Sequence, residues 1–289
     1  GAIAMLTSAP FDDWWHNAYG LDVQIISPPH LVLAAGIFAN LMGSLFLLIA
    51  EKNLATGKQK YFLELLFMYA ASLIVVQSAI LLTEFSFHNK QHTYEFFKYS
   101  LTIYSFLIVS FRIVGEHKYS ATIISILFIV HRCLIIWILP LFKAEPLLGP
   151  IYRDIDHYVA PYFPVLIVAP AIAIDLIHNK FQKQNSLIKP IMMGGAFCII
   201  FSLIQWNFAE FLLSEHARNW FFAGDNTFPY WVRVNENNYK FWFLDWTPYG
   251  HRTELERVSI YNFGFLIIFT IAFSYLGSFF GSWIKKVKR

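Results

Sequence analysis

The sequence predicts an all-α protein, a polytopic bundle of about seven transmembrane helices with an aromatic-rich cap on the extracytoplasmic side. Two features of the composition support this class. Hydrophobic residues make up 57% of the chain and charged residues only 14%, whereas soluble domains carry about 25% charged residues. The aromatic content of 19% agrees, because Trp and Tyr gather at both faces of a bilayer.

Apolar runs along the chain supply the predicted helices. A helix rises about 1.5 Å per residue and needs about 20 residues to cross a hydrocarbon core of about 30 Å. The runs that approach this length are 31–50, 61–83, 98–115, 121–142, 162–178, 190–213 and 259–283. Lys98 and Arg112 bracket the third run tightly, so that it spans only if both side chains snorkel to the interfaces.

Charges between the runs predict the orientation of the bundle. The connections 51–60, 112–120, 178–189 and 284–289 hold 12 Lys and Arg against two acids. The segments on the other side, 1–30, 84–98, 143–161 and 214–258, hold nine Lys and Arg against 14 acids. Basic connections stay in the cytoplasm, so we expect the N-terminus outside, the C-terminus inside and the chain in a bacterial inner membrane. This topology needs an upstream helix, a cleaved signal or the translocation of a short tail.

The chain divides into three parts on this basis. Residues 1–30 are expected to form an extracytoplasmic segment with an interfacial helix, and residues 284–289 a cytoplasmic basic tail. Residues 31–283 form the seven-helix membrane domain, which includes the long loop 214–258. This loop is rich in Trp and is expected to provide the cap.

Histidine is concentrated on the predicted outer side. Imidazole suits copper, zinc, iron and nickel, and carboxylate widens the choice of metal. Seven of the ten histidines fall in outer segments, which also hold most of the acids. These seven are His16, His30, His88, His92, His157, His216 and His251.

The N-terminal segment contains the densest group of such residues. Asp12 and His16 are four residues apart, so that they share a face if the segment is helical. Ser27 followed by two prolines predicts a helix start, which places His30 at the outer mouth of the first spanning helix. The three side chains are expected to converge on a metal or a proton-handling site. The alternative is an interfacial anchor in which Asp12 caps the helix and His16 contacts headgroups.

Two other groups of histidines and acids are predicted on the outer side. Asp154, Asp156 and His157 precede the fifth run, and the alternative to ligand binding is a solvated loop. Glu84, His88 and His92 are spaced four residues apart. They would form one polar stripe on a continued helix or, alternatively, a hydrated loop.

Polar residues inside the predicted membrane are also candidates, because charges there are costly and usually functional. His131 and Arg132 lie halfway along the fourth run, and Glu210 lies near the outer end of the sixth. His131 and Arg132 form either a buried hydrogen-bonded pair or a proton or substrate element. Glu64 and Asp175 are close to cytoplasmic helix ends and are expected to need little explanation.

Several catalytic motifs are absent from the sequence. It contains no GxGxxG, P-loop, HExxH or GxSxG pattern, so that nothing supports phosphate chemistry or a hydrolytic triad. Cys133 and Cys198 fall inside apolar runs and are expected to be core residues.

Two stretches resemble an uncharacterised family of polytopic bacterial membrane proteins. The first combines FDDWWH, GLDV and SPPH between residues 11 and 30, and the second is PYFP followed by VAPAIAID between residues 161 and 175. This resemblance implies the membrane fold and no particular activity.

A more distant similarity concerns the copper-holding membrane subunit of the copper-dependent methane and ammonia monooxygenases. That family uses Asp-x3-His-x12-His, and Asp12-x3-His16-x13-His30 is one residue longer. Its ligands lie on membrane helices, whereas these residues flank a proline break. The similarity implies an Asp/His/His copper site, oxidation of a small apolar substrate by O₂, and partner subunits.

Three functions are therefore expected in order of preference. The first is a metal-site subunit of a membrane redox or oxygenase assembly, with copper, or alternatively zinc or iron. The second is a metal-handling permease or transporter whose path is lined by His131, Arg132 and Glu210, and the third is a non-catalytic scaffold subunit. The predicted metal ligands are Asp12, His16, His30, Asp156 and His157, and the residues expected to orient the imidazoles are Asp13 and Asp22.

Overall fold

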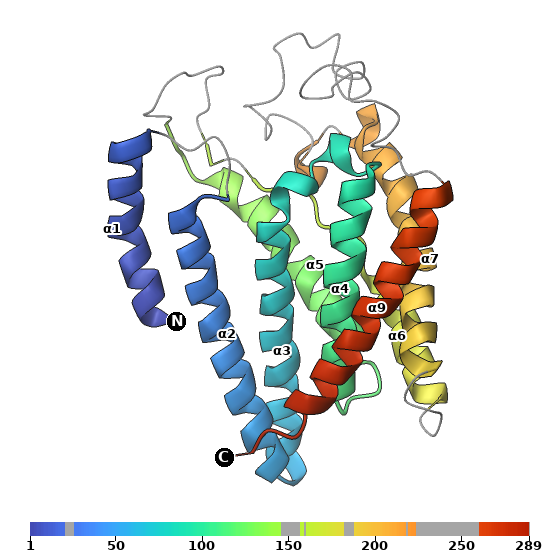
Figure 1. The fold of residues 1–289 in the computed structure, drawn as a ribbon. Helices are drawn as coiled ribbons and strands as arrows, with labels where there is room; N and C mark the ends of the chain where they lie inside the picture. Colours follow the sequence, from blue (N-terminus) through green and yellow to red (C-terminus); the bar gives the residue numbers. More distant parts are fainter. Residues whose placement is uncertain are drawn as a thin grey trace.

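The computed structural model of the protein describes residues 1–20, 26–145, 157–158, 160–181, 188–217, 219–223 and 260–288. Regular structure within these ranges is helical, apart from an isolated bridge between Lys143 and His157. Figure 1 shows the long helices side by side, with successive segments running in alternate directions. The all-helical prediction is confirmed for this part of the chain.

Within the described ranges, six helices are long and apolar enough to cross a membrane. They are α2 (Pro28–Leu54), α3 (Gly57–Leu81), α4 (Tyr94–Val114), α5 (Ser120–Ile138), α7 (Ile188–Leu212) and α9 (Ile260–Ile284). The short turn η3 (Leu139–Leu141) extends α5. The chain therefore has the helices of an integral membrane protein, at six of the seven predicted places.

The fifth predicted run differs from the other six. Residues 160–167 are not helical, and helix α6 (Val168–Lys180) covers only 13 residues. Pro161 and Pro164 explain the late start, because proline lacks an N–H and drives the residue before it away from helical backbone angles. This run does not form the full-length helix that its hydropathy predicted.

The two ends of the bundle need names. We call the end with Tyr19, Pro28 and Leu81 the upper end, and the end with Leu54 and Ile284 the lower end, as they lie in Figure 1. Besides η3, four short turns of the described chain lie at the upper end: η1 (Thr83–Phe85), η2 (His88–Lys90), η4 (Glu215–Ala217) and η5 (Trp220–Phe222). Most of the predicted cap, 224–258, lies outside the described residues.

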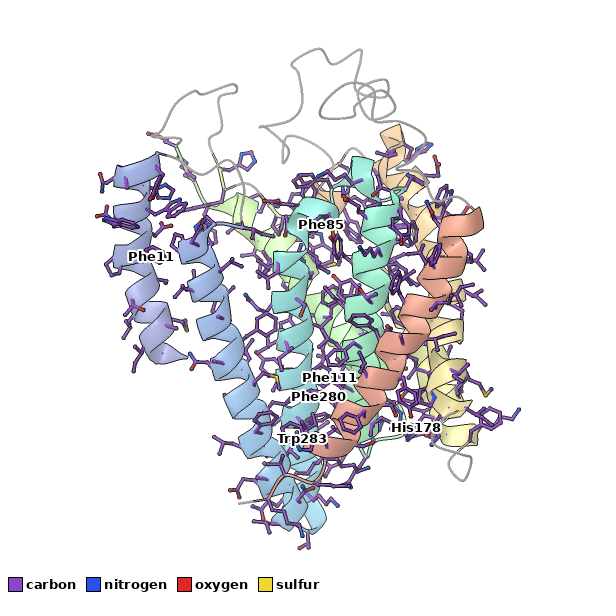
Figure 2. The ribbon with its side chains drawn as sticks, in the orientation of Figure 1. Phe11, Phe85, Phe111, His178, Phe280 and Trp283 are labelled. Carbon is purple, nitrogen blue, oxygen red and sulfur yellow. The ribbon has the colours of Figure 1, made fainter. Side chains whose placement is uncertain are left out.

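Helix α4 occupies the centre of the bundle and packs most extensively on α9. A Cβ added at Gly277 would lie 2.5 Å from the carbonyl oxygen of Phe106, and one at Gly281 would lie 2.5 Å from that of Ser110. Glycines four residues apart let two membrane helices approach this closely. Phe280, labelled near the lower end in Figure 2, lies on the same interface. Its ring packs on that of Phe106.

Two buried ion pairs tie the lower end together. Lys52 Nζ lies 2.8 Å from Glu64 Oε2, and Arg112 Nε lies 2.6 Å from Asp175 Oδ1. Arg112 is only 3% exposed, so that it does not snorkel to the interface as expected. It pairs inward because α6 presents a carboxylate at the same level, a contact between residues far apart in sequence.

The carboxylates of Glu64 and Asp175 also accept hydrogen bonds from backbone N–H groups. Glu64 accepts hydrogen bonds from the N–H groups of Glu116 and His117, at 2.7 and 3.0 Å. Asp175 accepts from the N–H and hydroxyl of Thr122, at 2.8 and 2.6 Å. The expectation that Glu64 and Asp175 need little explanation was wrong, because both carboxylates organise the connection between α4 and α5.

Candidate functional site

Helix α1 (Ala2–Tyr19) carries the first two residues of the candidate site. Asp12 and His16 are one helical turn apart and lie on one face, as their spacing predicted. The helix ends because Gly20 adopts a positive φ of 85°, which a residue without Cβ adopts readily. The carbonyl oxygen of Gly20 then lies 2.9 Å from Nδ1 of His16 and orients the ring.

Helix α2 supplies the third residue. Ser27 has extended backbone angles and the first helical positions are prolines, as predicted, although the Ser27 side chain makes no capping hydrogen bond. His30 therefore lies in the first turn of α2, at the upper end.

Close packing of α1 against α2 brings the two parts together. A Cβ added at Gly36 would lie 2.8 Å from Cγ of Met5, and the amide of Asn40 donates to the Met5 sulfur at 3.0 Å. The two helices are antiparallel neighbours in Figure 1. The interfacial location predicted for residues 1–30 stays a prediction.

One oxygen atom lies at the centre of the candidate site. Nε2 of His16 is 3.5 Å from Oδ1 of Asp12, and Nε2 of His30 is 3.6 Å from the same oxygen. Within the described part of the chain, this oxygen is buried and accepts no hydrogen bond. Phe11, labelled in Figure 2, marks this turn of α1. The structure thus brings Asp12, His16 and His30 to one place.

The tautomer of His16 limits what can lie between the ring and the carboxylate. A carbonyl oxygen only accepts hydrogen bonds, so the contact to Gly20 requires a proton on Nδ1. Nε2 of the neutral ring then presents a lone pair to Asp12. Two electron-rich atoms at this distance repel unless positive charge lies between them. A proton on Nε2, or another positive charge between the two atoms, would remove this repulsion.

The two separations from Asp12 Oδ1 can be compared with those between the ligands of a metal ion. Two ligand atoms bound at about 2.0–2.2 Å with a tetrahedral angle are about 3.3–3.6 Å apart. The 3.5 and 3.6 Å separations fall in this range. As the side chains stand, however, no group of three or more His, Cys, Asp or Glu residues in the described ranges could hold a metal ion. Binding would require the side chains to rotate.

The structure describes only some of the other predicted ligands and orienting residues. His157 lies in the bridge with Lys143, where the N–H of Tyr158 donates to the carbonyl oxygen of Phe142 at 3.1 Å. Asp13 is exposed on α1. Asp22, Asp154 and Asp156 lie outside the described residues.

The group of Glu84, His88 and His92 does not form a helical stripe, because α3 ends at Leu81 and two short turns follow. His88 is fully buried, and burial lowers its pKa to about 3. His92 lies 3.2 Å from Oε1 of Glu210, and its ring packs edge-on against Trp206.

The three intramembrane candidates have separate partners. Nδ1 of His131 lies 2.6 Å from the carbonyl oxygen of Leu127, and Nη2 of Arg132 donates to the carbonyl oxygen of Tyr162 at 3.0 Å. In the described part of the chain, no hydrogen bond joins His131 to Arg132, so the predicted pair is not formed. Glu210 pairs with His92 at the upper end.

Sequence reasoning missed two buried amides that support the non-helical stretch. Gln205 of α7 accepts from the N–H of Leu166 at 2.9 Å and donates to Gln91 at 2.8 Å. Both glutamines are fully buried. The available signal was Gln205 itself, a polar residue within an apolar run.

Comparison with known proteins gives no match: no protein-family model, no curated protein and no solved structure matches this chain. The two resemblances drawn from the motifs stay predictions. Function is therefore argued from the geometry of the site.

Proposed function

We propose that Asp12, His16 and His30 form a transition-metal site, filled by copper, and that the protein is a subunit of a membrane redox or oxygenase assembly. The observation that carries this proposal is the buried Oδ1 of Asp12, which accepts no hydrogen bond in the described ranges and lies within 3.6 Å of two imidazole nitrogens. A buried, unsatisfied carboxylate oxygen is costly without a cation.

Each residue has a distinct part in this proposal. His16 would bind through Nε2, because the carbonyl of Gly20 holds the proton on Nδ1 and fixes the ring as in other metal sites. His30 would bind from the first turn of α2, and the carboxylate of Asp12 would neutralise part of the metal charge. Asp156 and His157 remain proposed additional ligands, and Asp13 and Asp22 proposed orienting residues.

The choice of copper follows from the donor set. Two imidazoles and one carboxylate suit copper, zinc and iron, and sites made of nitrogen and oxygen ligands bind Cu²⁺ most strongly among the divalent first-row metals. Bound copper would supply one-electron redox chemistry. Three protein donors leave a coordination position open, which is typical of reactive rather than structural sites.

A metal-handling permease is the second candidate, and one observation favours it. Transporters commonly place their binding sites where a spanning helix gives way to non-helical backbone, and residues 160–167 are non-helical where the fifth span was predicted. His131, Arg132 and Glu210 have separate partners, which argues against a path lined by these three residues.

Metal analysis of the purified protein in mild detergent tests the proposal. After loading with copper and removal of the excess, we expect about one equivalent in the wild type, as one ligand set predicts. His16→Ala, His30→Ala and Asp12→Asn should each lose it. His117→Ala is the matched control, because this histidine belongs to the connection between α4 and α5 at the lower end.

The outcomes separate the proposal from its alternatives. Copper retained by His117→Ala and lost in the three site variants supports it. Copper that binds equally to all four variants, or a wild type that binds none at neutral pH, would overturn the proposal.

A further inference from the structure

One buried positive charge has no counter-charge in the described part of the chain. Lys, Arg, Asp and Glu contribute five buried side chains there. Four of them form the two ion pairs at the lower end. The fifth is Arg132 of α5, which is 5% exposed and makes no ion pair with a described carboxylate. A charge in the membrane interior is costly and marks a functional site by default.

The guanidinium of Arg132 is only partly satisfied. Nη2 donates to the carbonyl oxygen of Tyr162, whereas Nε is buried and has no hydrogen-bond partner within the described ranges. Among the described residues, the guanidinium therefore has neither a counter-charge nor a partner for Nε.

The backbone beside Arg132 is of the kind that lines binding sites. Non-helical backbone at membrane depth occurs where it is buried in protein or faces a cavity. Here Arg132 and Gln205 hold the stretch 160–167 from two sides, through the Tyr162 carbonyl and the Leu166 N–H. The stretch is thus fixed next to the uncompensated charge.

Apolar aromatic surface adjoins the charge. Phe163 directly follows Tyr162, and its ring packs on Phe208 and Phe222, at 5.6 and 5.1 Å between centroids. Trp137, one turn above Cys133, packs on Phe221 at 4.9 Å. We call this set the upper aromatic cluster: Trp137, Phe163, Phe208, Phe211, Phe221 and Phe222. It lies at the upper end, where α5 and α7 finish.

We propose that Arg132 binds the anionic group of an amphiphile, a carboxylate or phosphate that carries an apolar chain, with the chain against the upper aromatic cluster. Guanidinium groups bind carboxylate and phosphate through paired N–H donors, and the unpartnered Nε supplies such a donor. The anion cancels the buried charge, and the cluster provides an apolar surface for the chain. This site is separate from the proposed metal site and does not depend on it.

Binding of cis-parinaric acid, a fluorescent fatty acid, tests the proposal. The probe is titrated into purified full-length protein in mild detergent, with its uncharged methyl ester alongside. We expect the acid to bind the wild type more tightly than the ester does. Arg132→Gln should lower the affinity for the acid by about tenfold or more and leave the affinity for the ester unchanged. Arg132→Lys should retain part of the preference, and Lys98→Gln, which removes a cation of the neighbouring helix α4, should change nothing.

Further arms identify the source of the anion and control for folding. Native mass spectrometry should show anionic lipid on the wild type and not on Arg132→Gln. Displacement of the probe by inorganic phosphate alone would overturn the amphiphile in favour of a small soluble anion. Equal binding of acid and ester, or an unchanged affinity in a folded Arg132→Gln, would also overturn the proposal. If Arg132→Gln does not fold, Arg132→Lys and Phe163→Ala test the proposal instead, because both should lower the affinity for the acid.

Discussion

Lys52 and Glu64 form an ion pair that is almost completely removed from solvent, with 1% and 7% of their side chains exposed. Lys52 also donates to the carbonyl oxygen of Val114 at 3.1 Å and lies over the ring of Phe67. Every polar atom of the pair thus has a role in joining α2, α3 and the end of α4. Removing one partner would leave a buried charge without compensation.

Glu64→Gln is therefore expected to lower the free energy of unfolding by about 3–5 kcal/mol. The matched control is Glu116→Gln, since Glu116 pairs with Lys60 at 2.9 Å at the surface, with 41% and 39% of the side chains exposed. An exposed pair contributes about 1 kcal/mol or less. Denaturant titration in mixed micelles measures both, and equal losses would contradict the structural role assigned to the buried pair.

Helix α9 depends on glycine at its contact with α4. A Cβ at Gly281 would meet the carbonyl oxygen of Ser110 and the side chain of Ile113, whereas a Cβ at Gly264 on the same helix would meet nothing within 4 Å. The two positions have the same residue type and the same secondary structure, so that they isolate the effect of helix packing.

Gly281→Ala should accordingly destabilise the protein by about 1–3 kcal/mol, because the two backbones must move apart. Gly264→Ala should be neutral or stabilising by up to about 1 kcal/mol, since alanine favours helix. Thermal unfolding of both variants in detergent checks this. A Gly281→Ala variant as stable as Gly264→Ala would show that the close α4–α9 contact is not formed.

At the scale of the whole molecule, hydropathy predicted six of the seven helix positions. It could do so because a helix in lipid must satisfy its own backbone groups. It failed at residues 160–167, where Pro161 and Pro164 break the helix and side chains from α5 and α7 satisfy the backbone instead. No local pattern reveals such partners, which lie between 30 and 39 residues away in the sequence.

Sequence spacing indicated the candidate site, but it did not indicate the buried ion pairs. Asp12 and His16 are one helical turn apart, and the Ser-Pro-Pro sequence fixes His30 at a helix start. Arg112 and Asp175 are on different helices, and only tertiary packing places them together. Local spacing therefore predicts contacts within an element, such as that of Asp12 with His16, whereas the distance from Asp12 to His30 and the pairing of Arg112 with Asp175 come from the packing of helices.

The central claim is that one metal ion binds His16 and His30 together, across α1 and α2. Electron paramagnetic resonance of the copper-loaded protein measures this directly, because each coordinated imidazole nitrogen splits the Cu²⁺ signal. Superhyperfine coupling to two nitrogens in the wild type, and to one in both His16→Ala and His30→Ala with copper in excess, is the predicted result. A spectrum unchanged by either substitution, or one with no nitrogen coupling, would contradict the claim.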